Sequence, residues 1–172
     1  MLEPITPLNA GVLWRIMQSA QLREFQDVPR FTRDQFEKRV AARPKQFDGH
    51  AVGRFEWLVV PHESGVAIGW VSLRVGDLAG GVAELGYSIL AAHRGRGFAS
   101  EAATGIVDAS FAHSDLRQVD AACVPANIPS RRLLARLGFG EARVQRNGAI
   151  VRGRPVDILI FEMTKARWAA LR

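Results

Sequence analysis

Two glycines and two arginines between a predicted strand and a predicted helix form the most informative segment of the 172-residue chain. Arg94-Gly95-Arg96-Gly97 precedes residues 98–111, whose apolar side chains fall on one face of a helix. The first turn of a helix has unpaired backbone N–H groups and partial positive charge. Glycine lets the backbone approach a ligand closely, and arginine adds full charge. The segment therefore predicts a pyrophosphate site, with an ordinary tight connection as the alternative.

The glycine spacing excludes two common nucleotide motifs. Ser100 stands where a dinucleotide-binding Gly-x-Gly-x-x-Gly motif has its third glycine, and no Gly-Lys-Ser/Thr follows as in a Walker A loop. The pattern Arg94-x-x-Gly97-x-Ala99 instead resembles the acetyl-CoA signature of the GNAT N-acetyltransferases. This resemblance implies that the pyrophosphate is bound by Arg94, Gly95, Arg96, Gly97, Phe98 and Ala99.

A second segment, about 30 residues further on, resembles the other GNAT hallmark, Asn-x-x-Ser before a helix that ends in Leu-Gly-Phe. Asn127 and Ser130 supply the first part, and Phe139 ends the second. Pro129 suits the first turn of a helix and Gly138 suits its left-handed end. Taken singly, Asn127 and Ser130 are typical turn or cap residues. Their order and spacing after the first motif favour ligand contacts.

Three looser matches are similar to the ribosomal-protein alanine acetyltransferase branch, the RimJ/RimL-like GNATs. They are the segment from Leu22 to Val40, Glu84-Leu-Gly-Tyr87, and Gly153-Arg-Pro-Val-Asp157. The branch implies transfer of an acetyl group from acetyl-CoA directly to a primary amine, such as a protein N-terminus. Alternative acceptors are small amines and antibiotics, and a non-catalytic acetyl-CoA-binding module is a further alternative. The fold family also allows a homodimer.

The resemblance also assigns the rest of the cofactor site. Strand residues Ser88, Ile89 and Leu90 would pair with the pantetheine arm like an added strand. A backbone N–H within residues 87–89 would face the thioester oxygen. Asn127 and Leu133 would complete the contacts with the cofactor.

Stabilisation of the departing thiolate needs a group other than the usual one. Many GNATs carry a tyrosine acid on the helix before Leu-Gly-Phe, but Leu134 stands there and cannot donate a proton. The only tyrosine of the chain is Tyr87, on the preceding strand. In the ribosomal-protein branch a serine assists the sulfur, so Ser130 is the candidate catalytic residue, with helix capping as its alternative role.

Glu84 is the candidate general base, because it lies on the strand beside the expected cleft and could take the proton of the amine through water. An ion pair with an arginine is its alternative role. His93 and Asp157 are weaker candidates. An amine of low pKa, such as a protein N-terminus, needs little base.

Composition limits the remaining function classes. Hydrophobic content of 48% and charged content of 23% are typical of a globular protein, here one domain over residues 1–172. No apolar stretch is long enough to span a membrane. The net charge of +6 suits an anionic cofactor better than nucleic acid, since no aromatic-interleaved basic stripe is present. The single Cys123 suits a reducing cytoplasm and a buried strand rather than a nucleophile, and the four scattered histidines predict no metal site.

The predicted elements imply an α/β fold: a mixed, mostly antiparallel sheet of six to seven strands with helices on both faces. The resemblance adds that the sheet splays between its fourth and fifth strands to admit acetyl-CoA. Thr32 with Gln35 predicts a capped helix start. Helices are expected at 8–20, 33–42, 98–111 and 129–137, strands at 55–60, 66–74, 82–90, 118–124, 142–147 and 156–163, and a loop at 148–154.

Overall fold

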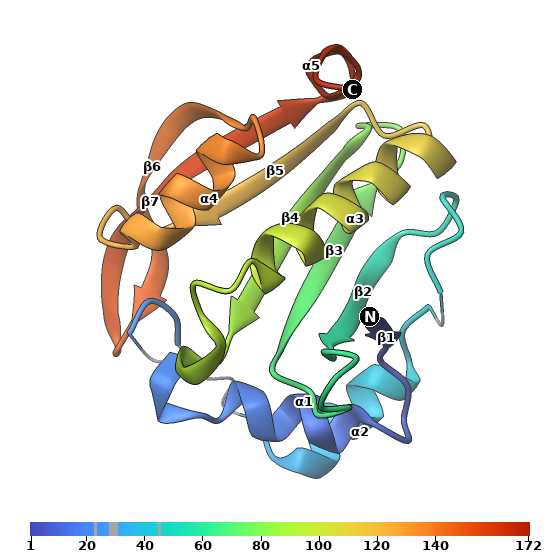
Figure 1. The fold of residues 1–172 in the computed structure, drawn as a ribbon, viewed down its shortest axis with the longest axis vertical. Helices are drawn as coiled ribbons and strands as arrows, with labels where there is room; N and C mark the ends of the chain where they lie inside the picture. Colours follow the sequence, from blue (N-terminus) through green and yellow to red (C-terminus); the bar gives the residue numbers. More distant parts are fainter. Residues whose placement is uncertain (23, 28–30, 45) are drawn as a thin grey trace.

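The computed structural model describes residues 1–22, 24–27, 31–44 and 46–172. One seven-stranded sheet has the order β1-β2-β3-β4-β5-β7-β6, and every neighbouring pair is antiparallel except β4 with β5 (Figure 1). The strands are β1 (Leu2–Pro4), β2 (Gly53–Val59), β3 (Gly69–Asp77), β4 (Val82–Ile89), β5 (Gln118–Cys123), β6 (Gly140–Val151) and β7 (Arg154–Thr164). The helices are α1 (Ala10–Met17), α2 (Arg33–Ala41), α3 (Phe98–His113), α4 (Ile128–Arg136) and α5 (Lys165–Ala170), with short 3₁₀ turns η1 (Ala20–Leu22) and η2 (Ala91–His93).

The parallel pair β4–β5 is joined along only part of its length. Pairing runs from Val82–Gln118 to Leu85–Ala121, whereas β4 continues to Ile89 and β5 to Cys123. Beyond the paired part the two strands diverge (Figure 1). The predicted splay between the fourth and fifth strands is therefore confirmed.

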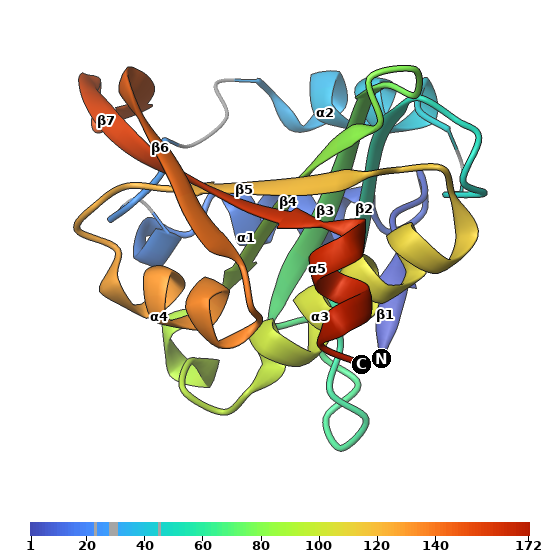
Figure 2. The ribbon, with the colours of Figure 1, turned by 90° about the horizontal axis from the view of Figure 1, so that it is seen from above.

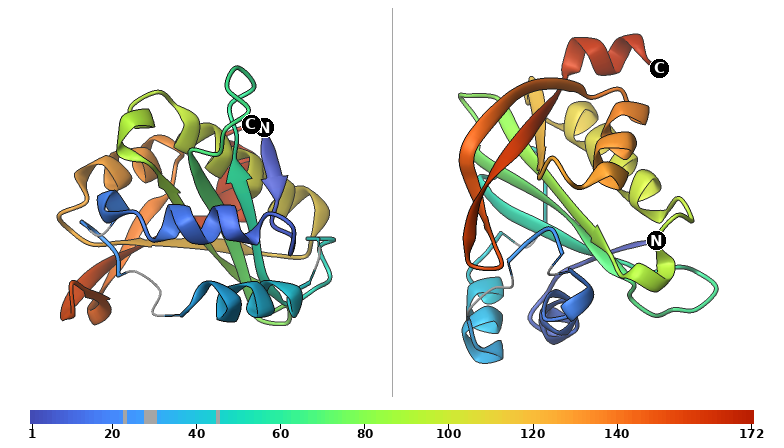
Figure 3. Two further views of the ribbon diagram at one scale, coloured as in Figure 1. Left: turned by 90° about the horizontal axis from the view of Figure 1, so that it is seen from below. Right: turned by 90° about the vertical axis from the view of Figure 1, so that its left-hand side faces the viewer.

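Alternation of side chains along the strands builds two separate cores. On one face, α3 packs on a large cluster that includes Leu73, Leu85 and Phe161. On the other face, α1 and α2 pack on a smaller cluster that includes Leu58 and Trp70. Figure 3 shows α3 on one side of the sheet and α1 and α2 on the other. The predicted mixed sheet with helices on both faces is confirmed.

Local sequence signals act as predicted at several helix ends. Thr32 and Gln35 form a reciprocal capping box at the start of α2. Pro129 lies in the first turn of α4, and Gly138 adopts a left-handed φ of 89° after it. The apolar face predicted for α3 is buried, with Ala103 and Phe111 almost wholly covered.

Several predicted boundaries are wrong. The loop expected at 148–154 does not exist, because β6 and β7 form one long ribbon whose turn has positive φ at Arg152 and Gly153. Figure 2 shows this ribbon extending beyond the rest of the sheet. The helix expected at 8–20 is the shorter α1, and the strand expected at 66–74 is β3, which begins at Gly69. Sequence reasoning missed β1 and α5 altogether.

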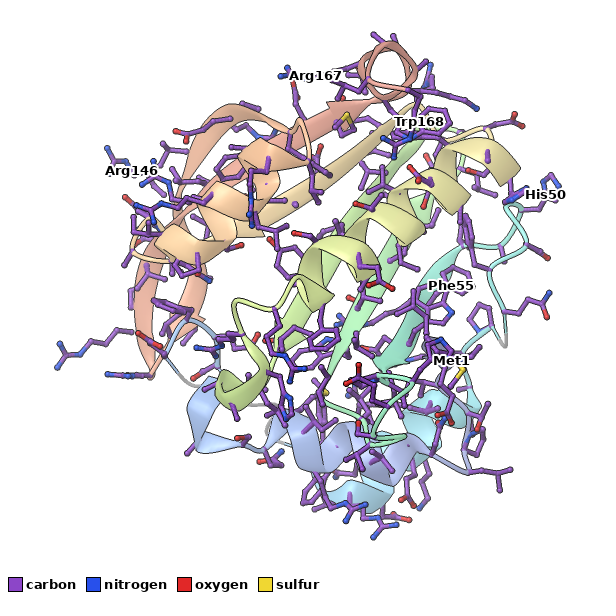
Figure 4. All side chains as sticks on the ribbon, viewed as in Figure 1. Met1, His50, Phe55, Arg146, Arg167 and Trp168 are labelled. Atoms are coloured by element: carbon purple, nitrogen blue, oxygen red, sulfur yellow. The ribbon has the colours of Figure 1, made fainter. Side chains whose placement is uncertain are left out.

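The last helix is anchored to α3. Trp168 Nε1 donates to Asp108 Oδ1 at 2.7 Å, and its ring lies 5.4 Å from that of Phe111, centroid to centroid. Figure 4 shows Trp168 between α5 and α3. Among the described residues, no helix is both long enough and apolar enough to cross a membrane.

Candidate active site

The predicted pyrophosphate loop leads directly into α3, a helix of 16 residues. Gly97 is the N-cap with a φ of 87°, and Gly95 has a φ of 75°. A Cβ atom at either position would meet nothing within 4 Å, so open space lies beside this backbone. The guanidinium of Arg96 lies 5.1 Å from the centroid of the Phe98 ring. The N-terminus of α3 thus offers the backbone N–H groups of its first turn, the helix dipole and the exposed cation of Arg96 to an anion.

Arg94 has a second role that the sequence did not indicate. Its Nε donates to the carbonyl oxygen of Ile89 at 3.0 Å, and its Nη1 lies 3.9 Å from Glu24 Oε2. The side chain therefore ties the loop back to the end of β4. This contact fixes the distance between the strand edge and the loop.

The backbone of β4 has polar groups pointing into the splay. Leu90 N–H donates to Ile68 O, which directs the backbone of Leu90 toward β3. In a strand the direction of these groups alternates, so the backbone of Ile89 and Tyr87 faces the other way, where β5 has diverged. Of the three residues expected to pair with pantetheine, Ile89 thus faces the splay, whereas Ser88 and Leu90 share their direction toward β3.

Of the two roles considered for Asn127 and Ser130, helix capping and ligand contact, the structure gives the capping role to the Asn127 side chain. Asn127 is the N-cap of α4, and its Oδ1 accepts from the N–H of Ser130 at 3.2 Å. The Ser130 hydroxyl is not part of this cap. Leu133 and Leu134 are both buried, and Leu134 belongs to the larger core, so this position contributes packing rather than an acid.

The hydroxyl of Ser130 instead meets Tyr87 across the splay. Tyr87 Oη and Ser130 Oγ lie 2.8 Å apart, joining β4 to α4. Burial raises the pKa of Tyr87 to about 12. Burial also raises the pKa of the neighbouring Cys123 thiol, which interacts with the same hydroxyl. The side chains of Tyr87, Ser130 and Cys123 thus form a neutral cluster between the diverging strands.

Glu84 lies on the opposite face of the sheet. Its carboxylate pairs with Arg74, its cross-strand partner on β3, and the Glu84 side chain is 50% exposed. On β5, Asp120 is the register partner of Glu84. The arginine pair considered as an alternative is therefore present, and solvent still reaches the carboxylate.

The two other candidate bases differ in their surroundings. His93 ends η2 directly before the loop, and its Nδ1 is buried with no hydrogen-bond partner among the described residues. Asp157 lies on the β6–β7 ribbon, where it accepts from the N–H of Asn147 at 3.0 Å and pairs with Arg146. These contacts hold the pKa of Asp157 below its usual value, which makes it a weaker base.

A buried carboxylate that sequence reasoning missed lies further along the sheet. The Glu56 side chain is 1% exposed and pairs with Arg43 and Arg54. No local pattern marks it, because its partners come from a loop and from its own strand. These three residues line a cavity of about 170 Å³ at the start of β2. In the described part of the chain, no group of three or more His, Cys, Asp or Glu side chains is arranged to hold a metal ion.

The amino-acid sequence was compared with models of known protein families. Residues 1–140 match the model of the acetyltransferase (GNAT) domain. The chain belongs to the GNAT family. GNAT enzymes use acetyl-CoA as a co-substrate, and the open, glycine-lined N-terminus of α3 fits its pyrophosphate. The resemblance found in the sequence motifs is confirmed.

This GNAT chain is similar in sequence to an uncharacterized acetyltransferase and similar in fold to acetyltransferases named for different acceptors. It is 32% identical over 111 residues, 64% of its length, to the uncharacterized N-acetyltransferase p20 of Bacillus licheniformis. The matches span from about a third to about three fifths of the length of the curated relatives. The ribosomal-protein-S5-alanine acetyltransferase of Vibrio fischeri superposes with a TM-score of 0.84 at 21% identity, covering 97% of this chain and 93% of that one. The spermidine/spermine N-acetyltransferase SpeG of Vibrio cholerae gives 0.81 at 18%, covering 99% and 96%.

The match also covers part of the looser sequence resemblance. Of the segment from Leu22 to Val40, residue 23 and residues 28–30 lie outside the described residues. Leu22 ends η1 and residues 24–27 form no helix or strand, whereas the capped helix α2 takes up the end of the segment from Arg33, on the face opposite α3.

Proposed function

We propose that the chain is an N-acetyltransferase that moves an acetyl group from acetyl-CoA to the α-amine of a protein N-terminus. The observation that carries the acceptor class is the pairing of Glu84 with Arg74 beside the splay. The family match supports acetyl-CoA as the donor, and the open space beside Gly95 and Gly97 supports the position of its pyrophosphate.

In this proposal the cofactor occupies the splay. The N-terminus of α3 and the loop from Arg94 to Ala99 bind the pyrophosphate. The backbone edge of Tyr87 and Ile89 that β5 leaves unpaired pairs with the pantetheine arm, with the Ile89 carbonyl also accepting from Arg94. An N–H of this edge polarises the thioester carbonyl. Asn127 fixes the start of α4, and Leu133 packs near the arm. The thioester then lies at the splay, with Ser130 on one side of the sheet and Glu84 on the other.

The chemistry follows from the placement of these two residues. The neutral amine attacks the carbonyl carbon, and the carbon–sulfur bond breaks with its electron pair on sulfur. Ser130 donates a hydrogen bond to the thiolate. Glu84 receives the surplus proton of the amine through a water molecule, for which its half-exposed carboxylate leaves room.

The charge around Glu84 favours an α-amine over a polyamine. Arg74 neutralises the carboxylate, so Glu84 adds little net attraction for a polycation. An α-amine has a pKa of about 7.7–8.0, so about a third of it is neutral near pH 7.5, compared with about one part in a thousand for an alkyl amine. A weak base, such as Glu84 in its ion pair with Arg74, is therefore sufficient for an α-amine.

A direct competition tests this proposal. A peptide with a free N-terminus, the same peptide with a blocked N-terminus and an internal lysine, and spermidine are each incubated with acetyl-CoA. Thiol release gives the rate, and mass spectrometry gives the acetylated atom. We expect kcat/KM for the free α-amine to exceed that for spermidine by at least about tenfold. A preference for spermidine, or acetylation of lysine alone, would overturn the acceptor class.

A thermal melt separates catalysis from mere binding. Acetyl-CoA at about 100 times its Kd stabilises the fold by about 2.7 kcal/mol, which raises Tm by about 5–10 °C for a domain of this size. Stabilisation without acetylation of any tested amine would identify a non-catalytic acetyl-CoA-binding module.

A further inference from the structure

We propose that Tyr87 is a positioning residue for acetyl transfer: its phenol donates to Ser130 Oγ and thereby directs the proton of the Ser130 hydroxyl toward the sulfur of departing coenzyme A. This inference rests on the proposed function. Many GNATs carry a tyrosine acid where this chain has Leu134. In this proposal Tyr87, on the other side of the splay, takes part in its place but acts only through Ser130.

The contact itself is specific and non-local. Tyr87 Oη and Ser130 Oγ are separated by 2.8 Å although the residues are 43 positions apart. Tyr87 packs against the larger core, and Ser130 is held by the Asn127 cap of α4. Both ends of the bond are thus fixed by elements that flank the splay.

The direction of the bond follows from the acidity of the two groups. A phenol is a stronger acid than an aliphatic hydroxyl, so the phenol is the better donor and the serine oxygen the better acceptor. A serine hydroxyl has only one proton. When Ser130 Oγ accepts from Tyr87, that proton remains available for a third group. In the protein alone the Cys123 thiol interacts with this hydroxyl. In this proposal the sulfur of bound coenzyme A competes with Cys123 for the Ser130 proton.

The same acidities exclude Tyr87 as the final proton source. Burial raises the pKa of Tyr87 to about 12, whereas an ordinary thiol has a pKa of about 8.5. Transfer of the phenolic proton to the thiolate would therefore be unfavourable by more than three pKa units. Tyr87 keeps its proton throughout, the thiolate leaves with a hydrogen bond from Ser130, and solvent supplies its proton later.

A double-mutant cycle tests the inference, using whichever amine the parent protein acetylates fastest. Tyr87→Phe keeps the ring and removes only the hydroxyl. We expect kcat to fall about tenfold, with KM for acetyl-CoA within about twofold of the parent. Ser130→Ala is expected to lower kcat by at least as much. The double variant is expected to be no slower than Ser130→Ala alone, because Tyr87 acts only through Ser130.

Each contrary outcome has a distinct meaning. An unchanged kcat in Tyr87→Phe, or losses that multiply in the double variant, overturns the positioning role. A lower Tm with an unchanged kcat at a temperature where the variant is folded identifies the bond as structural only. A parent protein that acetylates no amine contradicts the proposed function itself, and the inference fails with it.

Discussion

Glu84 and Tyr87 lie three residues apart on β4 and face opposite sides of the sheet, directly beside the point where β4 and β5 separate. Glu84 pairs with Arg74 on the side of α1 and α2, and Tyr87 meets Ser130 on the side of α3 and α4. The period of two in a strand produces this arrangement. One short segment thus presents a carboxylate to one face and a hydroxyl pair to the other. We expect the amine to approach from the first face and the thiol to depart on the second.

The base role of Glu84 predicts a change in the pH profile. In Glu84→Gln the side chain keeps its size but can no longer accept a proton. Because much of an α-amine is already neutral, we expect kcat to fall about tenfold and the rise of rate with pH to flatten, while Kd for acetyl-CoA stays unchanged. Rates over a range of pH with a free-N-terminus peptide measure this. Glu63→Gln, on the exposed loop between β2 and β3, is the control. A profile that matches the parent would assign Glu84 only to its ion pair with Arg74.

The pyrophosphate role of the α3 N-terminus predicts that Gly97→Asp weakens acetyl-CoA binding at least about 30-fold. The new carboxylate would stand where the phosphates bind and would repel them. Gly65→Asp is a matched control, because Gly65 also has a positive φ, 62°, and open space beside it, but lies in the loop between β2 and β3. Calorimetric titration with acetyl-CoA gives both affinities. Equal affinities in the two variants would remove the site assignment.

The single tyrosine makes its own titration measurable. Tyrosinate absorbance in the near ultraviolet reports Tyr87 alone, and we expect a midpoint of about 12 in the folded protein compared with about 10 in denaturant. Because the folded state holds the proton more tightly, this contribution to stability is complete below pH 10. It is lost as pH rises toward 12, by about 2–3 kcal/mol. A folded-state midpoint near 10 would contradict the burial of this phenol, and Tyr87→Phe should show no such transition.

The buried carboxylate of Glu56 predicts a stability effect distant from the splay between β4 and β5. Glu56→Ala leaves Arg43 and Arg54 without their common partner, and we expect the free energy of unfolding to fall by about 2–4 kcal/mol. Glu37→Gln breaks the more exposed pair with Arg33 and should stay within about 0.5 kcal/mol of the parent. Urea denaturation measures both. Similar losses in the two variants would show that burial of Glu56 adds nothing.

The parts of the fold that the sequence predicts are those with a local cause. The capping box of Thr32, the left-handed Gly138 and the apolar face of α3 each depend on residues a few positions apart. The strand β1 has only three residues and exists because it pairs with β2, so no local pattern marks it. The sequence predicts a break in the β6–β7 ribbon because glycine at position 148 is typical of a loop, whereas Gly148 lies within β6, where the register shifts.

In the candidate site too, the features with a local cause are predictable from the sequence and those that depend on tertiary contacts are not. The glycine loop and the Asn127–Ser130 spacing are local, so both could be assigned from the residues. The bond between Tyr87 and Ser130 joins residues 43 positions apart and depends on how β4 leaves β5. Its partners come from the tertiary arrangement, and no periodicity in the chain contains that information.

The strand order β5-β7-β6 has a consequence for how the protein is made. β5 is flanked by β7, whose residues leave the ribosome more than 30 positions after β5 ends. Until then, the edge of β5 away from β4 is open, and α4 lacks the β6 surface on which it also packs. Synthesis from the N-terminus therefore lets α3 pack on β3 and β4 first, whereas the β7 part of the α3 core and the β6–β7 side of the splay form last. A nascent chain is expected to gain affinity for acetyl-CoA only after β7 has emerged.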